Sequence, residues 1–290
     1  MANALSVRSK TGRSPIAEEV WLKEGLRQDL DQPHLLILIH GYQNSQATAE
    51  RSYRRFRNAL PKDAPREFGD PWELHWPGDH PRALISLATY SVREGLAITT
   101  GDRLAAFLAD QNRKQNVSII GHSLGCRVAL EAMRAIRRER RRGKYHGASV
   151  GSLVLLAAAV PVGLCRPDAN AGSEFPAPLT GSKEHVFFSR NDLVLRFGFG
   201  PGEFLFWAKD SAVGSTGHPD PRWSTRVETD IGHSDYWGSW IVADEIVDLI
   251  SGSRTRRRAV RPLPGHASRA QTRQLEDRRA PYRLLRTRLW

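Results

Sequence analysis

The sequence predicts an α/β protein in which a mostly parallel sheet carries helices on both faces. Short apolar runs that read as strands alternate along the chain with longer segments that read as helices, which is the pattern of repeated strand–helix units. The run at residues 34–40, HLLILIH, is continuously apolar. Such a run is typical of a parallel strand that is covered on both faces.

The elements follow one another in a regular order. The apolar spacing of residues 17–30 predicts an amphipathic helix, within residues 1–32 that we expect to form an N-terminal extension. We then predict strands at residues 34–40, 72–78, 117–122, 152–160, 185–190 and 224–230. Helices are predicted at residues 45–60, 102–111, 123–142 and 235–250.

Composition bounds the domain organisation and the location of the chain. The 290 residues are enough for one large α/β domain or two small ones, and we assign a single domain to residues 33–252. No run approaches the ~18 apolar residues of a membrane span, and no secretory signal is apparent. Two cysteines, Cys126 and Cys165, are too few for a disulfide framework. We therefore expect buried thiols and a cytoplasmic protein.

The positive charge is concentrated in a tail at residues 253–290. The chain has a net charge of +12, and the tail supplies +10 of it through twelve arginines against two acidic residues, so the remainder carries +2. Its composition is typical of a disordered segment, with a possible short helix at residues 282–289. Such a tail could bind nucleic acid or an anionic membrane, or could be a solvated extension without a partner.

A candidate nucleophile lies where a predicted strand turns into a helix. The motif GHSLG, Gly121 to Gly125, places Ser123 at this turn. A serine on such a tight turn has a strained backbone, and its neighbours two residues away on either side must be small. The N–H groups at the start of the helix could stabilise an oxyanion beside it. The alternative is a strand–helix turn with a serine that has no catalytic role.

A base and an acid follow the serine in the order that this chemistry uses. Asp192 comes just after the predicted strand at residues 185–190, and His233 just after the strand at residues 224–230. We predict that His233 takes the proton of Ser123 and that Asp192 orients the imidazole. Asp168 is the rival acid.

Other histidine and aspartate residues near Ser123, Asp192 and His233 in the sequence fit structural roles better than catalytic ones. Asp230 and Asp235 are too close to His233 in sequence to orient it easily and suit turns or caps. We expect His218 to be a solvated loop histidine and His122 to be packed or hydrogen-bonded.

An oxyanion hole needs two backbone N–H groups. We expect the first from Leu124, directly after the candidate nucleophile, and the second from Tyr42 in the loop after the first strand. Gly41 would let that loop approach the serine, and Asn44 and Ser45 could tether it. A plain connecting loop is the alternative.

These motifs together carry a resemblance. The segments LILIHGYQNS, HWPG, IIGHSLGCRVALEAM, SRNDLVL and IGHSDYW resemble the α/β-hydrolase superfamily, and most of all a largely uncharacterised bacterial branch with an H-G-Y-x-N loop. The resemblance covers residues 33–252. It implies an eight-strand, mostly parallel sheet and a Ser123–Asp192–His233 triad, but no particular substrate.

The expected function is that of a serine hydrolase, esterase or lipase-like, that cleaves a small carboxylic ester through an acyl-enzyme. Thioesterase or amidase activity, or a non-catalytic role, are the alternatives. We expect no cofactor and no metal, because no metal-binding or nucleotide-binding motif appears. Aromatic residues after the predicted acid are candidates for an apolar substrate wall, or equally for core packing: Phe197, Phe199, Phe204, Phe206 and Trp207.

Overall fold

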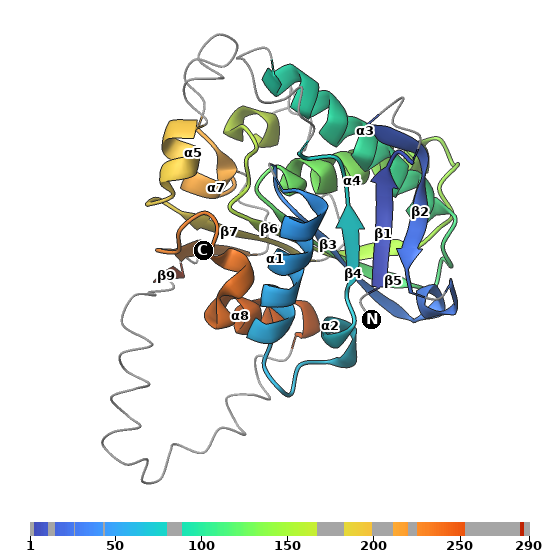
Figure 1. Ribbon diagram of the computed structural model, residues 1–290, viewed down its shortest axis with the longest axis horizontal. Helices are drawn as coiled ribbons and strands as arrows, with labels where there is room; N and C mark the ends of the chain where they lie inside the picture. The colour runs from blue at the N-terminus through green and yellow to red at the C-terminus, as the bar shows by residue number, and fades with distance from the viewer. Residues whose placement is uncertain are drawn as a thin grey trace.

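One sheet organises the computed structural model, which describes residues 3–10, 15–25, 27–42, 44–79, 89–166, 183–198, 211–219, 225–252 and 285–286. The sheet has the strand order β2-β1-β4-β3-β5-β6-β7-β8-β9 (Figure 1). Its strands are β1 (Asn3–Arg8), β2 (Ile16–Glu24), β3 (His34–Ile39), β4 (Trp72–His75), β5 (Asn116–His122), β6 (Ser149–Leu156), β7 (Lys183–Ser189), β8 (Thr225–Thr229) and β9 (Leu285–Arg286).

The predicted fold class is confirmed. Neighbouring strands from β1 to β8 are parallel, whereas β2 and β9 pair antiparallel at the two edges. The edge strand β9 has only two residues, and the eight longer strands match the eight-strand, mostly parallel sheet that we expected.

Helices cover both faces of this sheet (Figure 1). The α-helices are α1 (Gln46–Ala59), α2 (Arg66–Gly69), α3 (Thr89–Ala109), α4 (Gly125–Arg141), α5 (Leu193–Gly198), α7 (Val213–Thr216) and α8 (Trp240–Ser251), and short 3-10 turns are η1 (Arg27–Asp31), η3 (Val162–Cys165) and η5 (Tyr236–Gly238). One apolar core lies between the sheet and α3 with α4, and a second lies between the sheet and α1, α2 and α8.

Strand β3 shows why the sequence of a central strand is a continuous apolar run. Leu35, Ile37 and Ile39 point into the core under α3 and α4, while Leu36 and Leu38 point into the core under α1 and α8. Successive side chains of a strand face opposite sides, so a strand with helices on both sides is apolar at every position.

Some predictions of the elements are wrong. The segment 17–30 contains β2 and η1 rather than a helix, and the segment before residue 33 adds β1 and β2 to the sheet. Ile16, Val20 and Leu22 pack against the core. Their spacings of four and two residues fit one face of a strand, although the first also fits a helix. In the tail, the described pair at residues 285–286 is strand β9, not part of a helix.

Parallel strands have their carboxyl ends at the same end of the sheet. This carboxyl end, and not an outer strand, carries the candidate site. Ile39 pairs with Gly121 across β3 and β5, and with Leu74 across β3 and β4. The residues that follow these three strands are therefore neighbours, although they are far apart in the sequence.

Candidate active site

Ser123 lies at a sharp turn between β5 and α4. Its φ angle is +52°, in the left-handed region that a non-glycine residue rarely adopts. The turn is held to β6, because the Ser123 N–H donates to the Leu156 carbonyl at 2.9 Å and the Ser123 carbonyl accepts from the N–H of Ala159 at 3.1 Å. The strain is thus supported by main-chain hydrogen bonds on both sides of the serine.

The two glycines of the motif are required by close main-chain contacts. A Cβ atom on Gly121 would lie 2.9 Å from the Cα of Cys126, and one on Gly125 would lie 2.5 Å from the carbonyl oxygen of Ile39. Neither position can hold a larger residue without a shift of the backbone. Helix α4 can therefore start directly beside the serine and against the end of β3.

The structure brings Ser123, His233 and Asp192 together. His233 Nε2 lies 3.0 Å from Ser123 Oγ, and His233 Nδ1 lies 2.8 Å from Asp192 Oδ2. Because an ionised carboxylate only accepts, Nδ1 carries the hydrogen and Nε2 is left to accept the hydrogen of the serine hydroxyl. This series of hydrogen bonds makes the serine a candidate nucleophile with His233 as its base.

Asp192 is held in place by its own hydrogen bonds. It lies three residues after β7, is completely buried, and its Oδ1 accepts the N–H of Leu195 at the start of α5 at 3.0 Å. Oδ2 is the atom that faces His233. Each carboxylate oxygen thus has a donor, and the side chain is fixed toward the imidazole.

The rival candidates have other surroundings. Asp235 occupies the N-cap position of η5 without a capping hydrogen bond from its side chain, and its carboxylate lies 3.5 Å from the guanidinium of Arg55 on the surface. Asp168 lies outside the described residues. The prediction that His218 is solvated is wrong: it is only 1% exposed, because the loop after α7 packs against β7, where Gly217 contacts Phe188.

His122 contacts the main chain and the ring of the candidate base. Its Nε2 lies 2.7 Å from the carbonyl oxygen of His233, and the two rings are 5.1 Å apart. Burial lowers the pKa of His122 to about 3. It is therefore neutral at physiological pH, and its Nε2–H can donate to the carbonyl of His233. The sequence did not indicate this contact, which depends on how β5 and the loop after β8 meet.

The loop after β3 lies directly against the serine. A Cβ atom on Gly41 would be 2.9 Å from the Cβ of Ser123, so only glycine permits this approach. The Gly41 carbonyl accepts from His40 Nδ1 at 2.8 Å and from Asn44 Nδ2 at 3.2 Å. Ser45 caps α1 by accepting the N–H of Thr48 at 3.3 Å. The expected tether through Asn44 is therefore present.

Other parts of the expected site are outside the described residues. The side chain of Phe197 and residues Phe199, Phe204, Phe206 and Trp207 are among them. Within the part of the chain that the structure describes, no group of three or more His, Cys, Asp or Glu side chains is arranged to hold a metal ion. No helix in that same part has the length and apolar character to cross a membrane. Cys126 and Cys165 are buried free thiols.

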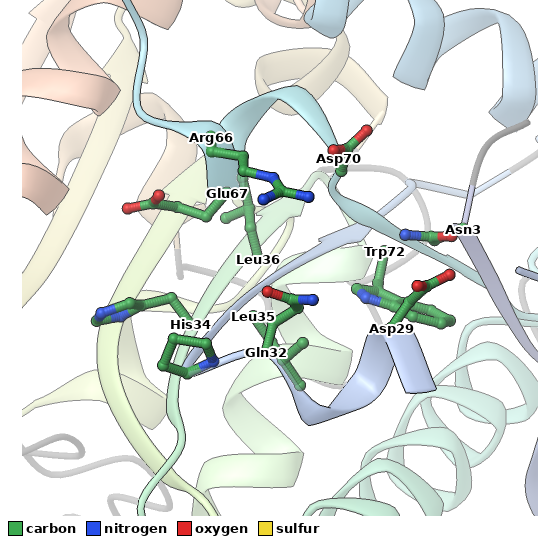
Figure 2. Close-up of a pocket in the computed structure, with 11 residues that line it drawn as sticks. Asn3, Asp29, Gln32, His34, Leu35, Leu36, Arg66, Glu67, Asp70 and Trp72 are labelled. Atoms are coloured by element: carbon green, nitrogen blue, oxygen red, sulfur yellow. The ribbon is translucent and has the colours of Figure 1, made fainter. Parts of the chain in front are cut away.

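A cavity of about 430 Å³ lies at the other end of the sheet, where the parallel strands begin (Figure 2). It is lined where β3 and β4 begin, at His34 and Trp72, and by η1 and α2, which contribute Asp29 and Arg66. Among its described lining residues there is no serine or cysteine, so it lacks a candidate nucleophile like Ser123.

The fold and the site define an α/β-hydrolase. The family model described as "Alpha/beta hydrolase of unknown function" (DUF900) matches residues 14–198, which is more than half of the chain. The protein belongs to this family. The matched range includes Ser123 and Asp192 and ends before His233.

Two further comparisons add little. No curated protein matches the chain. Among solved structures, the chain is similar to a protein from Lactobacillus plantarum WCFS1 that is named as a cell surface hydrolase, with 12% identity over 86% of this chain and 98% of that one. The TM-score is 0.38, which is too low to support an argument about this chain.

Proposed function

We propose that the protein is a serine hydrolase that cleaves a carboxylic ester through an acyl-enzyme intermediate. The observation that carries the proposal is the continuous hydrogen-bonded series from Ser123 Oγ through His233 to Asp192, with distances of 3.0 and 2.8 Å. A nucleophile, a base and an orienting acid within hydrogen-bond reach are the arrangement that activates a serine hydroxyl.

In the acylation step, Ser123 Oγ attacks the carbonyl carbon of the ester as His233 Nε2 takes the hydroxyl proton. The buried carboxylate of Asp192 stabilises the resulting imidazolium and keeps Nδ1 protonated. His233 then gives the proton to the leaving alcohol oxygen as the C–O bond breaks. The acyl group is left on Ser123.

The oxyanion of the tetrahedral intermediate needs N–H donors that are already in place. Leu124 precedes the first turn of α4, where the first N–H groups have no acceptor within a helix. The C=O and N–H of a trans peptide point in opposite directions, so the bonds that hold the Gly41 carbonyl also fix the direction of the Tyr42 N–H. This supports Tyr42 and Leu124 as the two donors.

Deacylation uses the same groups in the reverse sense. A water molecule attacks the acyl carbon while His233 Nε2 removes its proton, and the proton is then returned to Ser123 Oγ as the acid product leaves. No residue beyond the three and the two backbone donors is needed for this cycle. We propose an acyl ester as the small-molecule substrate; thioester or amide cleavage, or a non-catalytic role, are the alternatives to test.

The test is hydrolysis of p-nitrophenyl acetate and butyrate by the wild type, Ser123→Ala and Ser118→Ala. Ser118 is the matched control, because it lies on the same strand, β5, and is as buried as Ser123 at 8% exposed. We expect Ser123→Ala to lose at least about a thousandfold in kcat and Ser118→Ala to stay near the wild type. Equal rates for wild type and Ser123→Ala would refute the proposal. Thioester and anilide substrates with the same acyl group then separate the alternatives.

A further inference from the structure

The HWPG motif, residues 75–78, begins with the last residue of β4 and contacts the loop that lies against Ser123. Trp76, which is 1% exposed, donates its indole N–H to the His40 carbonyl at 2.8 Å and its backbone N–H to His40 Nε2 at 3.3 Å. The two rings are stacked, with centroids 5.7 Å apart and an angle of 22° between their planes. Trp76 therefore holds both the main chain and the imidazole of His40.

His40 passes this restraint to the loop. Nε2 accepts from Trp76, so Nδ1 carries the hydrogen and donates to the Gly41 carbonyl at 2.8 Å. The His40 N–H donates to the Tyr53 hydroxyl, which in turn donates to the Leu74 carbonyl. All four polar atoms of His40 thus have partners. Burial lowers the pKa of His40 to about 3, so this tautomer is kept throughout the neutral range.

The close packing at this point leaves the loop little freedom to move. A Cβ atom on Gly78 would lie 3.1 Å from the Gly41 carbonyl oxygen, so the end of the HWPG motif is in direct contact with the same peptide. Gly78 is itself held by a 2.8 Å bond from its N–H to the Trp76 carbonyl. The Gly41 carbonyl is thus held by His40 and Asn44 and lies against Gly78, and Gly41 itself lies against Ser123.

We propose that Trp76 is a positioning residue of the oxyanion hole, which acts through His40 to hold the Tyr42 N–H at the site of the developing charge. This inference rests on the proposed hydrolase function. Donors contribute to catalysis when they are fixed before the reaction, because then no free energy is spent on orienting them as charge develops. A loosened peptide would still allow the substrate to bind, but would stabilise the transition state less.

The experiment is Trp76→Phe, which keeps an aromatic ring and the backbone N–H but removes the indole N–H. With p-nitrophenyl butyrate we expect kcat to fall by about 10- to 100-fold with KM within about twofold, less than the loss of a whole oxyanion donor. Inhibition by a trifluoromethyl ketone with the same acyl chain, which forms an oxyanion on the serine, should weaken by the same factor. A purely structural role would not reduce this affinity in parallel with kcat.

Trp72→Phe is the matched control, because Trp72 is a buried tryptophan at the start of β4, the strand that Trp76 directly follows, and it lines the cavity of Figure 2. It should lower the unfolding temperature without changing kcat more than about twofold. If Trp76→Phe does not fold, benzothienylalanine at residue 76 replaces the indole N–H by sulfur at nearly the same volume and is expected to give the same loss.

The outcomes separate the two proposals. An inactive wild type overturns the hydrolase function and this inference with it. If the wild type is active and loss of the indole N–H leaves kcat unchanged, the positioning role of Trp76 alone is overturned. The same holds if Trp72→Phe lowers kcat as much as Trp76→Phe does.

Discussion

The buried histidine beside the candidate base makes the stability of the protein depend on pH in a calculable way. His122 is 6% exposed and donates to the His233 carbonyl, and burial, its largest influence, lowers its pKa to about 3. In the unfolded chain the pKa of a histidine is about 6.5. Between these values the unfolded state binds a proton that the folded state does not, so stability falls as the pH decreases below about 6.5.

His122→Phe removes this proton-linked contribution and keeps an aromatic ring against His233 and Trp237, whose rings lie 5.1 and 5.8 Å away. At pH 7 the variant should be less stable by about 1 kcal/mol, the typical value of one hydrogen bond. At pH 5 protonation of the unfolded wild-type histidine costs the wild type about 2 kcal/mol that the variant does not lose. The order of stabilities should therefore reverse between pH 7 and pH 5.

Urea unfolding of both proteins at pH 5, 6 and 7 measures this difference directly. The titrating groups that do not interact with His122 are common to both chains and cancel in the comparison. Stability curves for wild type and variant that stay parallel over this range would contradict the assignment of His122 as a buried, neutral hydrogen-bond donor.

Three further predictions concern the acid, the sharp turn that carries Ser123, and the tail. Asp192→Asn should retain the fold and lower kcat by about 10⁴, as in the well-studied serine protease case, whereas Asp168→Asn should stay within about tenfold; the reverse pattern in ester assays would identify Asp168 as the acid. Gly125→Ala should lower the unfolding temperature strongly, because its Cβ would meet the carbonyls at the end of β3, while Gly69→Ala, with nothing within 4 Å, should not; equal thermal shifts would contradict the packing. A chain truncated after Ser253 should lose salt-sensitive binding to DNA or anionic vesicles if the twelve arginines of the tail bind anions; equal affinity for both chains would remove that proposal.

The sequence predicts most of the site because strand ends are visible in it. Ser123 and Asp192 follow apolar strands and His233 follows a more polar one, β8, and parallel strands bring their carboxyl ends to the same end of the sheet. The loop of the proposed oxyanion hole is predictable for the same reason, since Gly41 follows the first strand of the predicted sheet.

Features that depend on tertiary contacts were not predictable. The spacing of Ile16 and Val20 fits a helix as well as a strand, and only pairing with β1 decides for β2. His218 is in a polar loop sequence, yet packing of that loop buries it. The contact of Trp76 with His40 joins residues 36 positions apart, and no local pattern indicates which side chains meet there.

The most direct measurement of the central claim is covalent labelling of the nucleophile. The wild type, Ser123→Ala and Asp192→Asn are incubated with a fluorophosphonate, and the site of any adduct is read by intact-mass and peptide mass spectrometry. An activated serine should give a single adduct on Ser123, absent in Ser123→Ala and much slower in Asp192→Asn, because the reagent reacts through the same attack that forms the acyl-enzyme. No adduct on the wild type, or an adduct of equal yield on Ser123→Ala, would contradict the assignment of Ser123 as the nucleophile.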